Sequence, residues 1–338
     1  MKAVYFEKFG GPEVLKYGEI PTPKPKKGEA LIKVKACALN HVDLHVRRGL
    51  IKIPLPHIPG CDVSGTVQKI KGKSKFLVGD EVIINPSIPC GECRQCKKGK
   101  NCEIVTIFGY GTQGGYAEYV TAPLEQLYQK PKNLSFVEAA AFPLTFLTAW
   151  RMLKTRANIQ KGETIFIWGA SGGLGAAAVQ IAKYLGVYVI VATKSSFSER
   201  GLKKLGADYF VNYVKGDVTK KVKKLTNNLG VDVVFETVGK ATWDRTLSML
   251  KPHGRVVISG TTSGAVASQD LSDVYYYQQT ILGSRMGYKD EFEEILKLVN
   301  QGKLKPVIDK IFPLKDVAKA QQRMESRKHF GKIVLEIK

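Results

Sequence analysis

The fold of this chain is decided by the run Ile165-Phe-Ile-Trp-Gly-Ala-Ser-Gly-Gly-Leu-Gly175. An apolar strand pattern enters the run and an alanine-rich helix pattern leaves it. A sharp turn of this kind favours glycine, since the backbone must bend, approach a pyrophosphate and pack against the helix. The free N–H groups at the helix start would then face the phosphates. The run predicts a dinucleotide-binding turn, although Ala170 stands where the first fingerprint glycine usually sits.

Around this turn, strand and helix patterns alternate from about residue 133 onward, beginning with a helix pattern over Glu138 to Leu153. Six strand candidates follow, the number found in a doubly wound dinucleotide-binding sheet. They are Thr164 to Trp168, Val187 to Ala192, Tyr209 to Tyr213, Val231 to Thr237, Arg255 to Ser259 and Thr280 to Gly283. The sequence therefore predicts an α/β fold with a doubly wound parallel sheet.

The first 130 residues have another texture, with short alternating strand patterns between Gly and Pro turns. These patterns cover Ala3 to Phe6, Ala30 to Ala36, Val63 to Ile70, Glu81 to Ile84 and Tyr116 to Thr121. They predict an antiparallel, barrel-like β domain. The tail returns to helix patterns, including Val317 to Glu325, and to a last strand over Lys332 to Ile337, so we expect it to fold back onto the first domain.

Length and composition agree with two globular domains, since the chain has 338 residues, 44% of them hydrophobic. No apolar run approaches the roughly 20 residues that span a bilayer, and the N-terminus has no secretory apolar core. We expect a cytoplasmic protein that does not bind membranes.

The formal net charge of +22 raises the alternative of a basic nucleic-acid-binding protein. The lysines are scattered, however, without a basic arm or interleaved stacking aromatics. Lysine-rich surfaces also occur in proteins of hyperthermophiles, as parts of ion-pair networks. We therefore expect a thermophile's surface and no nucleic-acid partner.

The end of the second strand bears on the choice of cofactor. An acidic residue there would bind a ribose 2′-hydroxyl, whereas cations and hydroxyls accommodate a 2′-phosphate. The sequence reads Thr193-Lys194-Ser195 at this point, with Glu199 as the nearest acid. It favours NADP(H) over NAD(H), and the proximity of Glu199 keeps NAD(H) open.

Four of the six cysteines fall within thirteen residues, in the pattern C-x2-C-x2-C-x5-C. In a chain without a secretory signal, this clustering favours a metal site over disulfides. A disulfide or an empty site remains open. The candidate ligands are Cys90, Cys93, Cys96 and Cys102.

Several motifs together resemble the medium-chain dehydrogenase/reductase superfamily, in particular its alcohol dehydrogenase-like and quinone oxidoreductase-like members. Besides the cysteine cluster, they are Ala38-Leu-Asn-His-Val-Asp-Leu44, Pro59-Gly-Cys-Asp-Val-Ser-Gly65, Val78-Gly-Asp-Glu-Val82, Gly114-Gly-Tyr-Ala-Glu-Tyr119 and Pro143-Leu-Thr-Phe-Leu-Thr148. The resemblance covers nearly the whole chain. It implies a GroES-like β-rich catalytic domain over residues 1–144, a Rossmann domain over 145–287 and a return to the catalytic domain over 288–338. It also implies a small-molecule substrate and a homodimer or homotetramer.

The resemblance further implies a set of cofactor contacts, of which Tyr213 and Lys332 rest on family position alone. The set comprises Thr148, Gly172, Gly173, Leu174, Gly175, Thr193, Lys194, Ser195, Tyr213, Ser259, Gly260, Thr261, Ser284, Arg285, Met286 and Lys332. The cysteine cluster resembles the superfamily's structural zinc lobe, which would brace a loop without taking part in the chemistry. Here five residues separate the last two cysteines, where about seven are usual.

The superfamily's catalytic zinc ligands are a Cys at the position of Asn40, a His at that of Cys61, and a Cys or Asp near Pro143. Here the first and third lack a thiolate or imidazole, and the usual proton-relay hydroxyl is replaced by Val42. A rebuilt site using Cys61, Asp62 and His41 is a second possibility. The departures favour a pocket without catalytic zinc.

In such a pocket the protein must supply donors to the oxygen on which negative charge grows. The candidates are Asn40, as an amide donor, and His41, as a donor or proton source whose ordinary pKa suits proton transfer. Asp43 is expected to orient this segment through hydrogen bonds. The resulting hypothesis is an NADP(H)-dependent reductase of a ketone, quinone or conjugated enone. The alternative is a zinc-dependent alcohol dehydrogenase with an altered ligand set.

Overall fold

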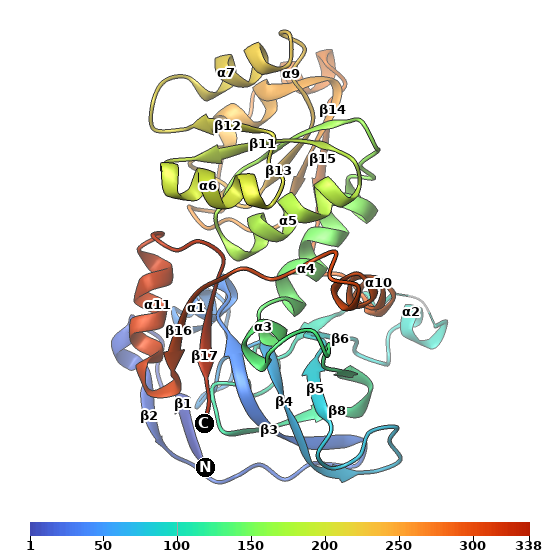
Figure 1. The fold of residues 1–338 in the computed structure, drawn as a ribbon, viewed down its shortest axis with the longest axis vertical. Coiled ribbons are helices and arrows are strands. Elements are labelled where there is room, and N and C mark those ends of the chain that lie inside the picture. The colour runs from blue at the N-terminus through green and yellow to red at the C-terminus, as the bar shows by residue number, and fades with distance from the viewer. Residues whose placement is uncertain (100) are drawn as a thin grey trace. The chain divides into compact units, whose positions relative to one another are not determined.

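The computed structural model describes residues 1–99 and 101–338 and divides the chain into two compact units. Unit 1 comprises Met1–Leu144 and Tyr288–Lys338, and unit 2 comprises Thr145–Gly287. In Figure 1 the first and last parts of the chain, in blue and red, both belong to unit 1. The tail thus returns to the domain in which the chain began.

Unit 2 contains a six-stranded sheet in which every neighbouring pair is parallel, in the order β12-β11-β10-β13-β14-β15. The first three strands extend the sheet in one direction and the last three in the other, so the order reverses between β10 and β13, as in the doubly wound nucleotide-binding fold. The strands are β10 (Thr164–Ile167), β11 (Tyr188–Thr193), β12 (Tyr209–Asn212), β13 (Val231–Glu236), β14 (Leu250–Ile258) and β15 (Thr280–Gly283).

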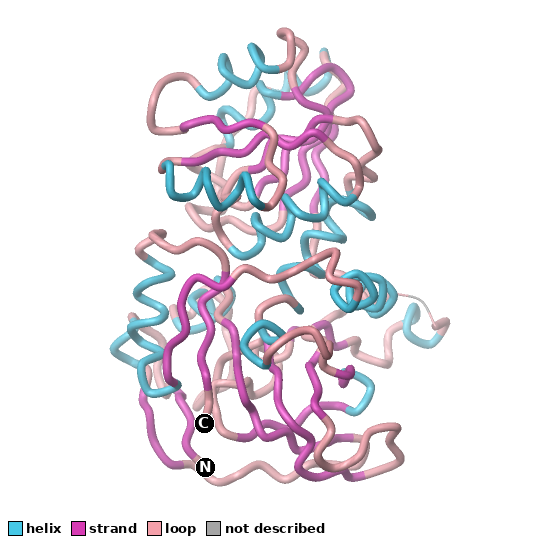
Figure 2. Tube along the Cα trace, viewed as in Figure 1, coloured by secondary structure: helices cyan, strands magenta, loops and turns pink. Residues whose placement is uncertain are grey.

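Helices lie on both faces of this sheet (Figures 1 and 2). They are α5 (Gly173–Tyr184), α6 (Ser196–Lys204), α7 (Val218–Leu225), α8 (Trp243–Thr246) and α9 (Leu271–Tyr276), with a 3-10 turn over Leu247–Met249. Covered on both sides, β13 is buried at every position, which explains its nearly continuous apolar sequence. The predicted doubly wound sheet is confirmed.

Unit 1 is built on a seven-stranded sheet in the order β16-β17-β3-β4-β5-β9, with β8 paired to the first half of β3. All its pairs are antiparallel except β16 with β17. The strands are β3 (Glu29–Ala38), β4 (Asp62–Lys71), β5 (Glu81–Ile84), β8 (Tyr119–Pro123), β9 (Leu127–Gln129), β16 (Ile308–Pro313) and β17 (Lys332–Glu336).

Smaller elements complete unit 1, and Figure 2 shows them around the sheet. Two pairs of short strands are β1 (Lys2–Tyr5) with β2 (Lys16–Glu19), and β6 (Ser87–Ile88) with β7 (Thr106–Ile107). The helices are α1 (His41–Arg47), α2 (Arg94–Lys97), α3 (Phe136–Ala140), α10 (Lys289–Asn300) and α11 (Val317–Glu325), with 3-10 turns over Pro12–Val14, Leu124–Gln126 and Leu314–Asp316.

The continuous helix predicted over Glu138 to Leu153 is wrong. The chain instead forms α3, breaks, and restarts as α4 (Pro143–Trp150), which continues as a π-helical segment over Arg151–Arg156. Pro143 causes the break, because proline has no N–H and its ring clashes with the preceding helical turn, whereas it is well accommodated at a helix start. Pro143 and the last residue of unit 1, Leu144, therefore begin the helix that leads into unit 2.

Three strand ends meet in unit 1 and position the candidate substrate site. In register, Ala38 at the end of β3 lies opposite Asp62 at the start of β4 and opposite Val334 of β17. Asn40 follows β3 by two residues, and Lys332 precedes Val334 by two. The backbone pairing thus brings Asn40, Asp62 and Lys332 to the same end of the sheet.

Candidate cofactor and substrate sites

The glycine-rich turn of unit 2 has the geometry that its sequence predicts. Gly169 follows β10 with φ +66, a conformation that glycine adopts without strain. At Gly175 an added Cβ would lie 2.3 Å from the Gly169 carbonyl oxygen, so only glycine fits there. At Gly172, apart from its two chain neighbours, the only heavy atom of the described residues within 4 Å of an added Cβ is that same oxygen, at 3.6 Å. The turn is therefore tightly packed at Gly175, while the space next to the Cα of Gly172 is open.

The start of α5 supplies donors at this opening. The N–H of Ala176 bonds to the Gly172 carbonyl at 2.8 Å, which is the first bond of the helix. The amides ahead of it have no carbonyl one turn earlier to bond within the helix. An open turn bordered by such amides, with the helix dipole behind them, fits the pyrophosphate of a nicotinamide dinucleotide.

The other predicted cofactor residues of unit 2, Thr148 excepted, lie at or just after the carboxyl ends of parallel strands, which meet at one edge of the sheet. Lys194 is exposed after β11, while Thr193 is buried and Ser195 caps α6 by accepting from the Ser198 N–H at 3.2 Å. Tyr213 follows β12, its ring 6.4 Å from that of Trp168. After β14 come Ser259, Gly260 and Thr261, and after β15 come Ser284, Arg285 and Met286. Thr148 is buried in α4.

Lys332, predicted to contact the cofactor, lies in unit 1 in a buried polar cluster. Its ammonium is 2.6 Å from Asn40 Oδ1 and 3.0 Å from Asp62 Oδ2. Asn40 Nδ2 donates to the same Asp62 oxygen at 2.9 Å, and the Leu144 N–H donates to the other at 2.8 Å. Lys332, Asn40 and Asp62 are 4%, 6% and 0% exposed. The cluster is a closed triangle in which one ammonium neutralises one carboxylate.

A second buried group surrounds Asp43. Its Oδ2 accepts from the backbone N–H of Asn40 at 2.7 Å and from the Tyr116 hydroxyl at 2.9 Å. The expectation that Asp43 orients this segment is confirmed. The Cys61 thiol also points at it, 3.7 Å from Oδ1. Burial, only partly offset by these hydrogen bonds, raises the pKa of Asp43 to about 6, and burial raises that of the Cys61 thiol well above its ordinary value.

His41, the first residue of α1, does not have the ordinary pKa that the sequence analysis assumed for it. Burial and the neighbouring positive charge of His329, His45, Arg327 and Lys332 lower the pKa of His41 to about 4. The imidazole is therefore neutral at pH 7. It retains one N–H to donate, but at neutral pH it does not hold the extra proton that a proton source needs, because desolvation disfavours the charged ring.

The donor set near Asn40 does not fit a catalytic zinc ion. The amide at this ligand position bonds to Lys332 and Asp62, and the thiol of Cys61 remains protonated beside Asp43. The third position, Pro143, has no ligand atom in its side chain. In residues 1–99 and 101–338, one group of three or more Cys, His, Asp or Glu is arranged to hold a metal ion, and it is the cysteine cluster.

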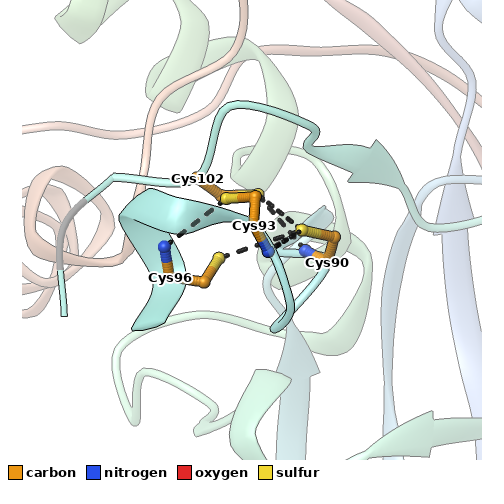
Figure 3. Close-up of side chains that lie close together, drawn as sticks. All are labelled: Cys90, Cys93, Cys96 and Cys102. Carbon is orange, nitrogen blue, oxygen red and sulfur yellow. Dashed lines mark hydrogen bonds between the residues drawn. The ribbon is translucent and has the colours of Figure 1, made fainter. Parts of the chain in front are cut away.

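The four cysteines of the cluster converge (Figure 3). All six cysteines of the chain are free of disulfides. All four sulfur atoms lie within 4.8 Å of one another, with Cys90 to Cys102 at 3.5 Å and Cys93 to Cys102 at 3.9 Å. A tetrahedral zinc site with Zn–S bonds of about 2.3 Å has sulfur atoms roughly 3.8 Å apart. The shortened spacing before Cys102 is therefore compatible with a closed four-thiolate site.

Backbone amides support thiolates in this lobe. Cys93 Sγ accepts from the Cys96 N–H at 3.4 Å, and Cys90 Sγ accepts from the Cys93 N–H at 3.3 Å. The bond from the Cys96 N–H is the largest cause that lowers the pKa of the Cys93 thiol, to about 6. Backbone hydrogen bonds from Glu92 and then Cys93 lower the pKa of the Cys90 thiol. Cys96 differs, because burial and its cysteine neighbours raise its pKa to about 12.

Two residues of these clusters had no assigned role in the sequence. Tyr116 lies in the Gly114-to-Tyr119 motif, and Asp62 entered only as a possible ligand of a rebuilt metal site. Both residues lie within superfamily motifs, and this was the signal by which sequence reasoning could have selected them. Their hydrogen-bond partners could not be inferred in this way, because they depend on which strands pair.

Among the described residues, no helix is long and apolar enough to cross a membrane.

Comparison with known proteins identifies the family. Residues 26–132 match the alcohol dehydrogenase GroES-like domain, and residues 173–301 match the zinc-binding dehydrogenase family. The chain is 34% identical to an NAD-dependent alcohol dehydrogenase of Sulfolobus acidocaldarius, over all of both chains. It is 32% identical to a quinone oxidoreductase of Pongo abelii, over 96% of this chain and 94% of the relative.

Solved structures agree with this assignment. A crystal structure of an NAD-dependent alcohol dehydrogenase is 41% identical over all of both chains, with a TM-score of 0.96. The predicted enzyme class is confirmed. With its GroES-like and Rossmann domains, the chain belongs to the medium-chain dehydrogenase/reductase superfamily and is an NAD(P)-dependent oxidoreductase.

Proposed function

We propose that this protein reduces a ketone, quinone or conjugated enone with NADP(H), without catalytic zinc. The observation that carries the proposal is the bonding of the Lys332 ammonium to Asn40 and Asp62. An ammonium in this position neutralises the Asp62 carboxylate and would repel a second cation. The positive charge of Lys332 and the amide N–H of Asn40 would then serve the reaction in place of a zinc ion.

In this proposal the dihydronicotinamide supplies the hydride. Asn40 holds the acceptor oxygen through its amide N–H, where negative charge grows as the hydride arrives. His41, neutral at pH 7, is a second donor that can orient the acceptor. The proton that completes the reduction of a ketone must come from elsewhere, because His41 is not protonated at this pH.

NADP(H) is preferred in the proposal because Lys194 is exposed directly after β11, next to the hydroxyl of Ser195, with no acid at the strand end. A lysine and a hydroxyl match a 2′-phosphate. Two relatives are named NAD-dependent alcohol dehydrogenases, which favours NAD(H) instead. Measuring the rates with NADPH and with NADH decides between the two cofactors.

The experiment is NADPH and NADH oxidation measured against a panel of quinones, enones, ketones and aldehydes, together with metal analysis. We expect NADPH oxidation with at least one class of acceptor and one zinc per chain, held by the four cysteines. If no acceptor on the panel is reduced with either cofactor, the proposal is wrong.

The second candidate is a zinc-dependent alcohol dehydrogenase with an altered ligand set, favoured by the proximity of Cys61 to Asp43 and Asp62. It requires Lys332 to leave the cluster and the Cys61 thiol to lose its proton. Two zinc ions per chain, together with alcohol oxidation abolished by Cys61→Ser, would favour this candidate. A nucleic-acid-binding function has no support among the relatives named above.

A further inference from the structure

The amide of Asn40 has a single permitted orientation. With Oδ1 toward the Lys332 ammonium and Nδ2 toward the Asp62 carboxylate, both contacts are favourable. Rotation of the amide by half a turn would place the oxygen against the carboxylate and the NH2 group against the ammonium. Both contacts would then be repulsive, and in a buried place water cannot relieve them.

This orientation leaves one donor available. An asparagine amide has two N–H hydrogens, and within the described part of the chain Asp62 accepts one of them. The second hydrogen points away from both Asp62 and Lys332, since the amide is planar. Asn40 can donate it to a substrate oxygen without losing a bond that it already makes.

The charge on Lys332 also acts on the strength of this donor. A hydrogen bond from an ammonium to Oδ1 withdraws electron density from the amide, and hydrogen bonds in a chain polarise one another. At 2.6 Å the contact has the short length of a charge-assisted bond. The ammonium thus makes the free N–H of Asn40 a better donor to a developing negative charge.

We propose that Lys332 is a positioning residue of hydride transfer, which fixes and polarises the Asn40 amide through its ion pair with Asp62. This inference rests on the proposed function, because it requires Asn40 to bind the acceptor oxygen. It differs from the role that family position implies for Lys332, which is contact with the cofactor. The two roles make opposite predictions for cofactor affinity.

The test is a double-mutant cycle of Asn40→Ala and Lys332→Met, with Lys328→Met as the matched control. Lys328 is an exposed lysine four residues earlier in the same segment. The readouts are kcat and KM for the acceptor identified on the panel, and the Kd of NADPH from its fluorescence. Asn40→Ala should lower kcat about 100-fold, the usual effect of removing one donor to a developing oxyanion.

Lys332→Met should lower kcat by a factor of at least 10 and leave the Kd of NADPH within twofold of the wild type. The double variant should be no slower than Asn40→Ala, because Lys332 acts through Asn40 and the two effects are not independent. Lys328→Met should behave as the wild type. A raised Kd for NADPH in Lys332→Met, or multiplied losses in the double variant, would overturn the inference.

Lys332→Met leaves Asp62 buried without its cation and so threatens folding. If the variant does not fold, Lys332→Met is combined with Asp62→Asn, which removes the buried carboxylate together with its cation. This combined variant then replaces Lys332→Met in the cycle, with the same criteria for kcat and for the Kd of NADPH relative to the wild type. A wild type that reduces no acceptor refutes the proposed function itself. If the wild type is active and the losses of kcat in the two single variants multiply in the double variant, only the role of Lys332 is refuted.

Discussion

The Lys332 ammonium lies 2.6 Å from the amide oxygen of Asn40, although the two residues are 292 positions apart in the sequence. The contact exists because β17 at the end of the chain pairs with β3 near its beginning. The C-terminal return is therefore part of the candidate substrate site, and loss of the last strand would remove its cation.

The first prediction concerns the glycine-rich turn. Gly172→Val should leave the fold intact, because an added Cβ has room and the backbone there is extended. It should raise the Kd of NADPH at least tenfold, since the side chain would occupy the space open to the pyrophosphate. Fluorescence titration measures the Kd, and thermal unfolding checks the fold. An unchanged Kd would show that the cofactor does not approach Gly172.

Gly175→Ala is the matched variant of the same turn. Its Cβ would meet the Gly169 carbonyl oxygen at 2.3 Å and the Ala170 Cα at 2.5 Å, so the loss should appear in stability. We expect roughly 1–3 kcal/mol of destabilisation, the usual effect of overpacking. Chemical denaturation measures it. A variant as stable as the wild type would mean that the turn relaxes without cost.

A second prediction separates the two cofactors. Lys194→Ala should raise the Kd of NADPH about tenfold and leave that of NADH nearly unchanged, because a single cation beside a 2′-phosphate is lost. Lys204→Ala, at the other end of α6, is the control for general loss of positive charge. Equal changes for both cofactors in Lys194→Ala would contradict the proposed selectivity.

The sequence predicted the buried strands well, as for β13, which spans Val231–Glu236 against the predicted Val231 to Thr237 and is buried at every position. It did not predict β16, in which Asp309 and Lys310 interrupt any apolar alternation because the strand lies half exposed at the edge of its sheet. Asn40 could be selected from its motif. Its contact with Lys332 could not, because a side-chain contact over that separation depends on which strands pair.

A third prediction concerns the cysteine lobe. Cys93→Ser should reduce the zinc content from one per chain to well below one, because serine is a poor ligand for a closed thiolate site. The melting temperature should fall by about 5 °C or more, given that each kcal/mol corresponds to roughly 2–4 °C in domains of 150–250 residues. Metal analysis and calorimetry check both. A wild type without zinc, prepared without chelator in zinc-supplemented medium, would contradict the metal site.

The fourth prediction concerns pH and the carboxyl of Asp43. Its pKa is raised to about 6 in the folded protein, above the ordinary value of 3.8, so the folded state binds the proton more tightly. The contribution to stability is therefore complete below pH 3.8 and is lost as the pH rises through 6. Two pKa units correspond to roughly 3 kcal/mol. Relative to Asp43→Asn, the wild type should lose up to that amount between pH 4 and 7, as measured by urea unfolding. If the difference in the free energy of unfolding between the wild type and Asp43→Asn stays constant from pH 4 to 7, the prediction is wrong.

The last prediction concerns the expected association of subunits. Among the described residues β15 pairs with β14 alone, so no strand covers its other edge, where the Gly283 carbonyl accepts from the Arg156 side chain at 2.8 Å. Ile281 on this strand is 43% exposed, and Tyr275 and Tyr276 of α9 are 73% and 74% exposed. Apolar side chains beside an open strand edge favour association with a second copy. Ile281→Pro should therefore weaken the homo-oligomer, whereas Val266→Ser, in the loop before α9, should not. Light scattering over a range of concentrations measures the mass, and a wild type that is monomeric at every concentration would contradict the prediction.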